Sequence, residues 1–144
     1  MSDLTAPELA LEFPAKPEYL RVARHAVAAL ARLHAVPEDC VEDVKLAVSE
    51  ACARAVAGAV PEEAPPVELR AQVEATAVVV EVLDRGPGPE REVSGPPEDI
   101  DTGELPFEAV LTLPLIRGLV DDLAIGPREG GGTRLRMVFA LPEP

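Results

Sequence analysis

The most constraining feature of this sequence is a run of β-branched residues that ends in an acidic, glycine-spaced segment. Residues 77–83 read AVVVEVL and are followed directly by residues 84–88, DRGPG. Such a run predicts a buried strand. Asp84 can accept a hydrogen bond from an exocyclic amine, while Gly86 and Gly88 let the backbone approach a ligand closely. The junction is therefore a candidate site for reading a purine, although a turn that simply closes a strand would use the same residue types.

The length and composition predict one acidic domain. The 144 residues, 47% of them apolar, are enough for a single core, and we expect one domain over residues 1–144 with a flexible start at residues 1–8. Neither a signal peptide nor a run of about 18 apolar residues is found, so we expect a cytoplasmic protein. The net charge of −13 opposes nucleic acid and anionic membrane surfaces. It suits a basic protein partner, or it serves solubility alone.

The cysteines and histidines predict no metal site. Cys40 and Cys52 lie on one predicted helix, roughly 18 Å apart along its axis, whereas a disulfide needs Cα atoms within about 7 Å. They cannot pair with each other. Because the two histidines complete no typical ligand spacing, we assign no metal and expect both cysteines to be small packing residues.

Two helices are predicted in the first half of the chain, after a short strand at residues 9–13. Apolar periodicity and an early proline predict the first helix over about residues 17–34. Pro37 and the acidic residues after it open a second helix over residues 37–59. The expected core positions, spaced by three and four residues, are Leu20, Ala23, Val27, Leu30 and Leu33 in the first helix, and Val41, Val44, Val48, Ala51 or Cys52, Ala55 and Ala59 in the second.

The second half predicts a sheet. Residues 67–73 and 77–83 predict a hairpin, and the proline-rich and glycine-rich residues 85–106 predict a long, lid-like loop. After it come a third helix at about 115–123, a short extended pair at 124–125 and a last strand at 133–139. This order predicts an α+β fold, a two-layer sandwich whose mixed, mostly antiparallel sheet carries its helices on one face.

A second face of the long helix carries charged residues among small ones. It contains Asp43, Ala47, Glu50 and Arg54. Charged side chains in such company indicate a face that borders a pocket, although a solvated face has the same composition.

Four separated segments, taken in order, resemble the anti-sigma-factor serine kinases of the histidine-kinase-like ATPase superfamily. They are residues 49–56 (SEACARAV), 84–88 (DRGPG), 113–121 (LPLIRGLVD) and 131–135 (GGTRL). The similarity spans nearly the whole chain, and four motifs in order are far more specific than any one of them. The resemblance implies a Bergerat-type ATPase fold, with ATP or ADP as a candidate ligand.

The resemblance also assigns roles on the second helix. In the family, a Glu acts as general base, and an Asn four residues later binds the magnesium that bridges the phosphates. Glu50 matches the base, but Arg54 stands at the Asn position. A guanidinium has only donors and a fixed positive charge, so it cannot ligate magnesium. We therefore expect the magnesium site to be lost.

Arg54 has two expected roles in such a pocket. Because Arg54 lies four residues after Glu50 on the same helix, the two side chains can form an ion pair. A partly buried pair of this kind would neutralise the base and act as a plug that blocks the phosphate end of the pocket. Alternatively, Arg54 contacts phosphate oxygens directly and lets nucleotide bind without metal. We favour the plug.

The family's adenine contacts are retained, whereas its lid is not. Asp84, Gly86 and Gly88 match the family pattern, and Thr133 matches its adenine-side Thr, although a glycine run before a strand is also an ordinary hairpin turn. Family members have a glycine-rich stretch before the third helix. Residues 110–113, VLTL, contain no glycine there, so we expect the lid to be defective.

These observations predict a regulatory protein of the anti-sigma-factor type that acts by binding proteins, with ATP binding and serine kinase activity weakened or lost. The resemblance implies a sigma factor, an antagonist protein or both as partners, and it makes a homodimer possible. The alternative is an active ATP-dependent protein-serine kinase with Glu50 as base and Asp84 selecting adenine. Losing magnesium and the lid amides together should slow such transfer by many orders of magnitude. A third candidate is a sensor that binds nucleotide without turnover.

Overall fold

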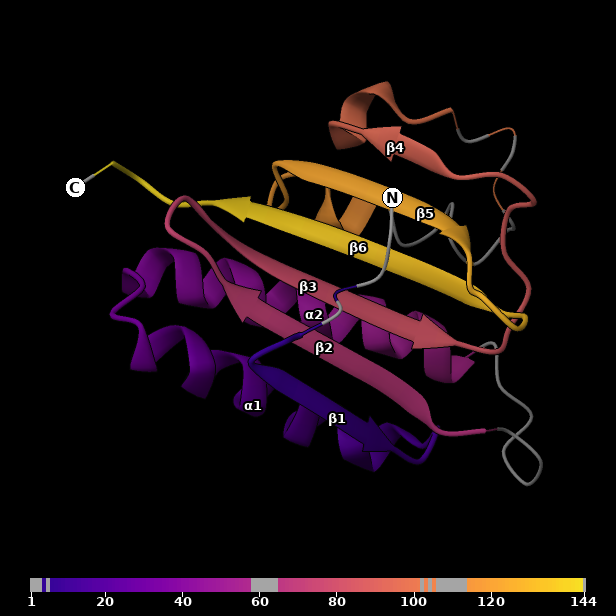
Figure 1. Cartoon of the computed structure of the whole chain (residues 1–144), viewed down its shortest axis with the longest axis horizontal. Helices are drawn as coiled ribbons and strands as arrows, with labels where there is room; N and C mark the ends of the chain where they lie inside the picture. The colour runs from indigo at the N-terminus through magenta and orange to yellow at the C-terminus, as the bar shows by residue number, and fades with distance from the viewer. Residues whose placement is uncertain are drawn as a thin grey trace.

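The fold has two layers, with a six-stranded sheet packed on a pair of helices (Figure 1). The computed structural model describes residues 4, 6–57, 65–101, 103, 105 and 114–143. All pairings among the described strands are antiparallel. The predicted α+β sandwich with helices on one face is confirmed.

The sheet is built from a central, fully buried strand outward. Its strands are β1 (Leu9–Phe13), β2 (Val67–Val73), β3 (Ala77–Asp84), β4 (Val93–Gly95), β5 (Asp122–Pro127) and β6 (Thr133–Ala140), in the spatial order β1-β2-β3-β6-β5-β4. The four predicted strands are confirmed to within one residue. β3 is buried at every position, because β2 and β6 flank it and Val78, Val80 and Val82 face the helix layer.

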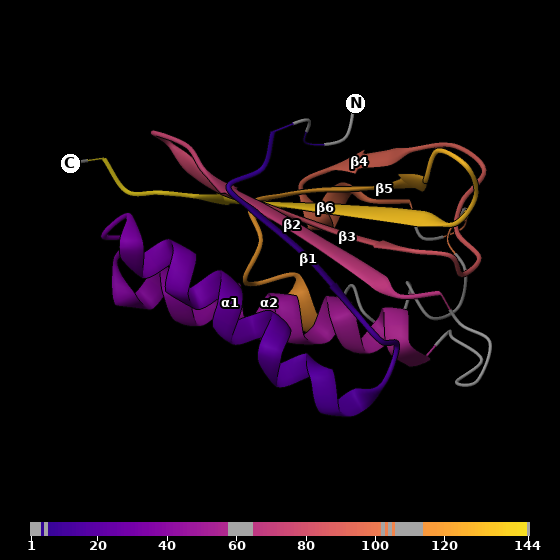
Figure 2. The ribbon, with the colours of Figure 1, turned by 60° about the horizontal axis from the view of Figure 1, so that its bottom comes forward.

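In the described part of the chain, the helix layer contains two long helices that lie side by side against the sheet (Figure 2). A short 3-10 helix, η1 (Pro17–Tyr19), leads into α1 (Leu20–Leu33), and α2 (Glu38–Ala57) follows. α2 begins where the sequence predicts, since two acidic residues occupy its first turn, where the helix dipole favours negative charge. None of the helices in the described part of the chain is both long and apolar enough to cross a membrane.

The helix cores follow the prediction in α2 and depart from it in α1. The expected α2 positions Val41, Val44, Val48, Ala51, Cys52 and Ala55 are all buried, and Ala59 lies outside the described residues. In α1 the buried residues are Ala23, Val27, Ala28 and Ala31, while Leu33 is 79% exposed. The prediction for Leu33 was wrong because small alanines face the sheet and α2, which lets the layers approach closely.

The predicted loop at 85–106 contains regular structure and is in part an edge of the sheet. Its strand β4 pairs with β5, from Val93 opposite Ile125 to Gly95 opposite Leu123. A short 3-10 helix, η2 (Pro97–Asp99), follows. Prolines and glycines in this segment therefore bound a short edge strand, as edge strands tolerate such residues.

The third helix ends earlier than predicted. Residues 114–116 are helical, but Asp122 and Leu123, which the prediction placed in that helix, begin β5. β5 includes the predicted extended pair and has a continuous ladder with β6, from Asp122 opposite Val138 to Pro127 opposite Thr133. Backbone pairing with β6, the next strand along the chain, outweighs local helix propensity here.

Candidate functional site

The candidate site lies where the last turns of α2 face the end of β3. Arg54 comes from α2, and Asp84 is the last residue of β3. Because alternate residues of a strand face the same side, Asp84 faces the helix layer together with Val80 and Val82. The Arg54 Nη2 donates to Asp84 Oδ2 over 2.6 Å, and each side chain is only 6% exposed. The two residues form a buried ion pair.

The residues of α2 next to Arg54 are small and buried. Ala51, Cys52 and Ala55 on α2 are all buried beside Arg54 in the helix. Burial raises the pKa of the Cys52 thiol to about 12, although the nearby positive charge of Arg54 lowers it. A charge in such a place must be paired, since an isolated one would be very costly to bury.

The second oxygen of Asp84 is also engaged. Its Oδ1 accepts the backbone N–H of Gly86 over 2.7 Å, which makes a short turn directly after β3. Each carboxylate oxygen of Asp84 thus has a donor from within the chain. The group that would read a purine amine is already hydrogen-bonded on both oxygens.

Gly86, Gly88, Gly132 and Thr133 pack closely around the end of β3. Thr133 lies opposite Asp84 in the β3–β6 ladder, and its Oγ1 donates to the carbonyl oxygen of Gly86 over 3.0 Å. A Cβ on Gly88 would overlap Thr133 Oγ1, and one on Gly132, whose φ is +109°, would overlap the Asp84 carbonyl. These glycines are therefore required for local packing, whether or not a ligand binds.

Glu50 lies one helical turn before Arg54 and is partly exposed. Within the described residues it makes neither a hydrogen bond nor an ion pair with Arg54. The predicted ion pair between Glu50 and Arg54 is wrong. Arg54 pairs instead with Asp84, which comes from β3. An i,i+4 pair on a helix contributes little, whereas two buried opposite charges within reach must neutralise each other.

The structure therefore brings together most of the residues predicted for the site. They are Arg54, Asp84, Gly86, Gly88 and Thr133, with Glu50 a turn away on α2. Sequence reasoning missed that Arg54 and Asp84 are partners. The available signal was that both residues were expected on the pocket side of buried elements, where each charge needs an opposite one.

The residues present do not fit the magnesium ion that the fold implies. Arg54 offers no lone pair to a cation, and its guanidinium would repel one. His, Cys, Asp and Glu side chains of the described residues form no group of three or more that could hold a metal. Asp84, the residue that would read a purine amine, already accepts one donor from within the chain on each of its oxygens. The predicted lid change at residues 110–113 lies outside the described residues.

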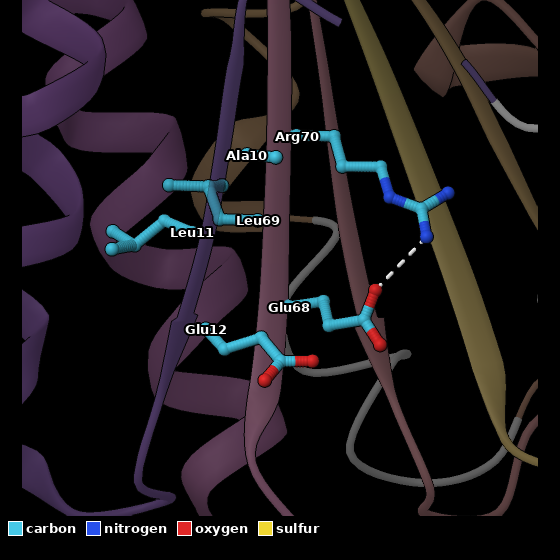
Figure 3. Close-up of a pocket in the computed structure, with 6 residues that line it drawn as sticks. All are labelled: Ala10, Leu11, Glu12, Glu68, Leu69 and Arg70. Carbon is cyan, nitrogen blue, oxygen red and sulfur yellow. Dashed lines mark hydrogen bonds and ion pairs between the residues drawn. The ribbon is translucent and has the colours of Figure 1, made fainter. Parts of the chain in front are cut away.

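A concave region lies elsewhere, at the β1–β2 edge of the sheet (Figure 3). In this view Glu68 and Arg70 point away from Leu11 and Leu69, which face the helices. Arg70 donates to Glu68 over 2.9 Å, and Arg128 pairs with the same carboxylate. Because these charges satisfy one another, this region offers less chemistry than the corner around Asp84.

Comparisons with known proteins agree with this fold. Residues 13–139 match the family described as the histidine kinase-like ATPase domain. The chain is 30% identical to serine-protein kinase RsbW of Listeria innocua over 128 residues, which cover 85% of this chain and 82% of the relative. The solved structure of the RsbU and RsbW domains of Rv1364c from Mycobacterium tuberculosis superposes with a TM-score of 0.66 at 19% identity. That match covers 96% of this chain and about a third, 34%, of the solved chain.

Proposed function

Because the chain belongs to the histidine kinase-like ATPase family, and within it to the anti-sigma-factor serine kinases, we propose that it is a regulatory protein that acts by binding other proteins. Its partners would be a sigma factor, an antagonist protein or both, and its phosphoryl transfer would be weakened or lost. The observation that carries this proposal is the buried Arg54–Asp84 ion pair.

The ion pair supports weakened catalysis for an electrostatic reason. Phosphoryl transfer depends on positive charge positioned against the phosphates, usually through magnesium. Arg54 cannot ligate that metal, and its own charge is neutralised by Asp84. A general base such as Glu50 contributes about 10²- to 10⁴-fold, which does not replace the missing electrostatics.

The charge of the chain supports a protein partner. The formal net charge of −13 favours association with a basic protein surface and disfavours nucleic acid. We expect the protein to work in the cytoplasm, where such partners are found. Salt should weaken the complex, because long-range attraction between exposed charges is screened at high ionic strength.

Affinity capture tests the proposal directly. The tagged full chain, used as bait in native lysate of the source organism at low and at high salt, should recover a sigma factor or a small antagonist protein, more strongly at low salt. An unrelated tagged domain of similar net charge serves as the control for non-specific capture. Recovery of neither protein class, or equal recovery by the control, would contradict the proposal.

The active kinase is the second candidate, and the partly exposed Glu50 favours it. Transfer of labelled phosphate from ATP to the captured antagonist, abolished by Glu50→Gln, would establish this alternative. If the proposal holds, the wild-type chain transfers little or no more phosphate than the Glu50→Gln variant.

A further inference from the structure

The Arg54–Asp84 pair joins two elements that are far apart in the sequence. Arg54 is on α2 and Asp84 ends β3, thirty residues later, so the pair fastens the helix layer to the sheet. Both side chains are 6% exposed. Opening the pair would leave two buried charges without partners, because no other ion pair of Arg54 or Asp84 is found among the described residues.

We infer that Arg54 excludes purine nucleotides from this pocket by occupying Asp84, and that it replaces the ligand as the link between α2 and the end of β3. The inference deepens the proposed function, since it rests on this corner being the family's nucleotide pocket. If so, Arg54 decides whether the pocket accepts a nucleotide. The contact between α2 and the end of β3 then forms without any ligand.

Competition at Asp84 favours the arginine. A purine amine is a neutral donor, whereas the Arg54 guanidinium is charged, and charge-assisted hydrogen bonds are roughly twice as strong. Arg54 is also held in place by its own helix, so it loses no translational freedom when it binds, as a free ligand must. The other Asp84 oxygen accepts the Gly86 N–H over 2.7 Å, so a purine amine would have to share the carboxylate with two donors that are already in place.

Removing the guanidinium should reverse this exclusion. In Arg54→Asn the side chain is shorter and neutral, so one oxygen of Asp84 is released and space opens between α2 and β3. The freed carboxylate can then accept the exocyclic amine of adenine. It would repel the carbonyl oxygen that stands at the same position in the base of inosine triphosphate (ITP).

Calorimetric titration with ATP, ADP and ITP, each with magnesium, tests the inference. The wild-type chain should bind none of them below millimolar concentration, while Arg54→Asn should gain about tenfold or more in affinity for ATP and ADP, and not for ITP. The control is Arg32→Asn, which removes an exposed arginine from its pair with Glu38 and should leave affinity unchanged. Micromolar binding of ATP by the wild-type chain, or a folded Arg54→Asn variant without any gain, would overturn the inference.

Hydrogen exchange of the wild-type chain provides a second test that needs no variant to fold. The amide of Gly86, which donates to Asp84, and the amides of the last turns of α2 should be protected without ligand, and millimolar ATP with magnesium should not slow their exchange further. Slower exchange on adding ATP would contradict the inference. Neither measurement involves a partner protein, so its failure is distinct from failure of the capture experiment, which tests the proposed function.

Discussion

The two ends of α2 carry the same kind of ion pair under opposite conditions. At its start, Glu38 accepts from Arg32 over 2.9 Å, with the two side chains 66% and 46% exposed. Near its end, Arg54 donates to Asp84 over 2.6 Å, with both side chains 6% exposed. Water and salt screen the first pair, while the second must persist because neither charge can remain buried alone. The two pairs thus have similar N···O distances but different importance: the Arg32–Glu38 pair can be replaced, whereas the fold requires the Arg54–Asp84 pair.

The largest difference between the two ends should appear in thiol reactivity. Cys40 lies in the first turn of α2 and is partly exposed, whereas Cys52 is buried near the other end. Burial raises the pKa of Cys52 to about 12, and burial together with the neighbouring Asp43 raises the pKa of Cys40. We expect a disulfide reagent to modify Cys52 more than about 10³-fold more slowly, since its access requires unfolding.

Stopped-flow absorbance of single-cysteine variants measures this difference. In denaturant both thiols should react at similar rates, which controls for intrinsic reactivity. A native Cys52 that reacts within a factor of ten of Cys40 would show that this end of α2 opens readily.

The next largest effect should come from Arg54→Met, which keeps the length of the side chain and removes its charge. The variant leaves Asp84 buried without its partner, so we expect the free energy of unfolding to fall by about 3–5 kcal/mol in a urea titration. The double variant Arg54→Met/Asp84→Leu should recover much of that loss, because no charge is then stranded. A single variant as stable as the wild-type chain would mean that Asp84 finds water or another donor.

Removing the exposed pair should have a much smaller effect. Arg32→Ala leaves Glu38 in water, so we expect a loss of unfolding free energy that is a small fraction of the Arg54→Met loss and that disappears at high salt. Urea titrations of both variants at low and high salt provide the comparison. A salt-independent loss for Arg32→Ala would indicate that its aliphatic stem, rather than its charge, stabilises this end.

The smallest effect should be a pH dependence near the exposed end. The Val73 N–H, followed by His34 at the end of α1, lowers the pKa of Glu8 from its ordinary value of 4.5. A lowered folded-state pKa stabilises the fold above the ordinary value, and that contribution is lost as pH falls through the folded-state pKa. The wild-type chain should therefore be slightly more stable than Glu8→Gln at neutral pH, with the difference shrinking below about pH 4.5 in thermal melts. A difference independent of pH would contradict this assignment.

The sequence predicts the elements whose patterns are local. The β-branched run of β3 and the spacing of apolar residues in α2 are confirmed, because each element buries one continuous set of side chains. Leu33 was predicted to lie in the core, but it is exposed. Its apolar character alone does not reveal that the smaller alanines of α1 fill the closely packed face instead. β5 was missed in part because its stability comes from the ladders with β4 and β6, which the residues of β5 alone do not reveal.

The sequence predicted which residues meet at this corner, but it did not predict that Arg54 pairs with Asp84. The junction after the β-branched run pointed to Asp84, and the family resemblance added Arg54 and Thr133 as candidates. The partner of Arg54 could not be read from spacing, because Asp84 reaches it only after the sheet has packed on α2. The spacing of four residues on the helix favoured Glu50 as the partner of Arg54. An ion pair at that spacing is weak, so Asp84 outcompetes Glu50 for the guanidinium.

The close contacts of Gly88 with Thr133 and of Gly132 with the Asp84 carbonyl have a consequence for the comparison of related genomes. Larger residues at these positions would be removed by selection for folding alone. A lineage that abandons its nucleotide would therefore keep the glycine signature long after the ligand is gone. In such lineages, the residue at the position of Arg54 is a better marker of nucleotide use than the glycines.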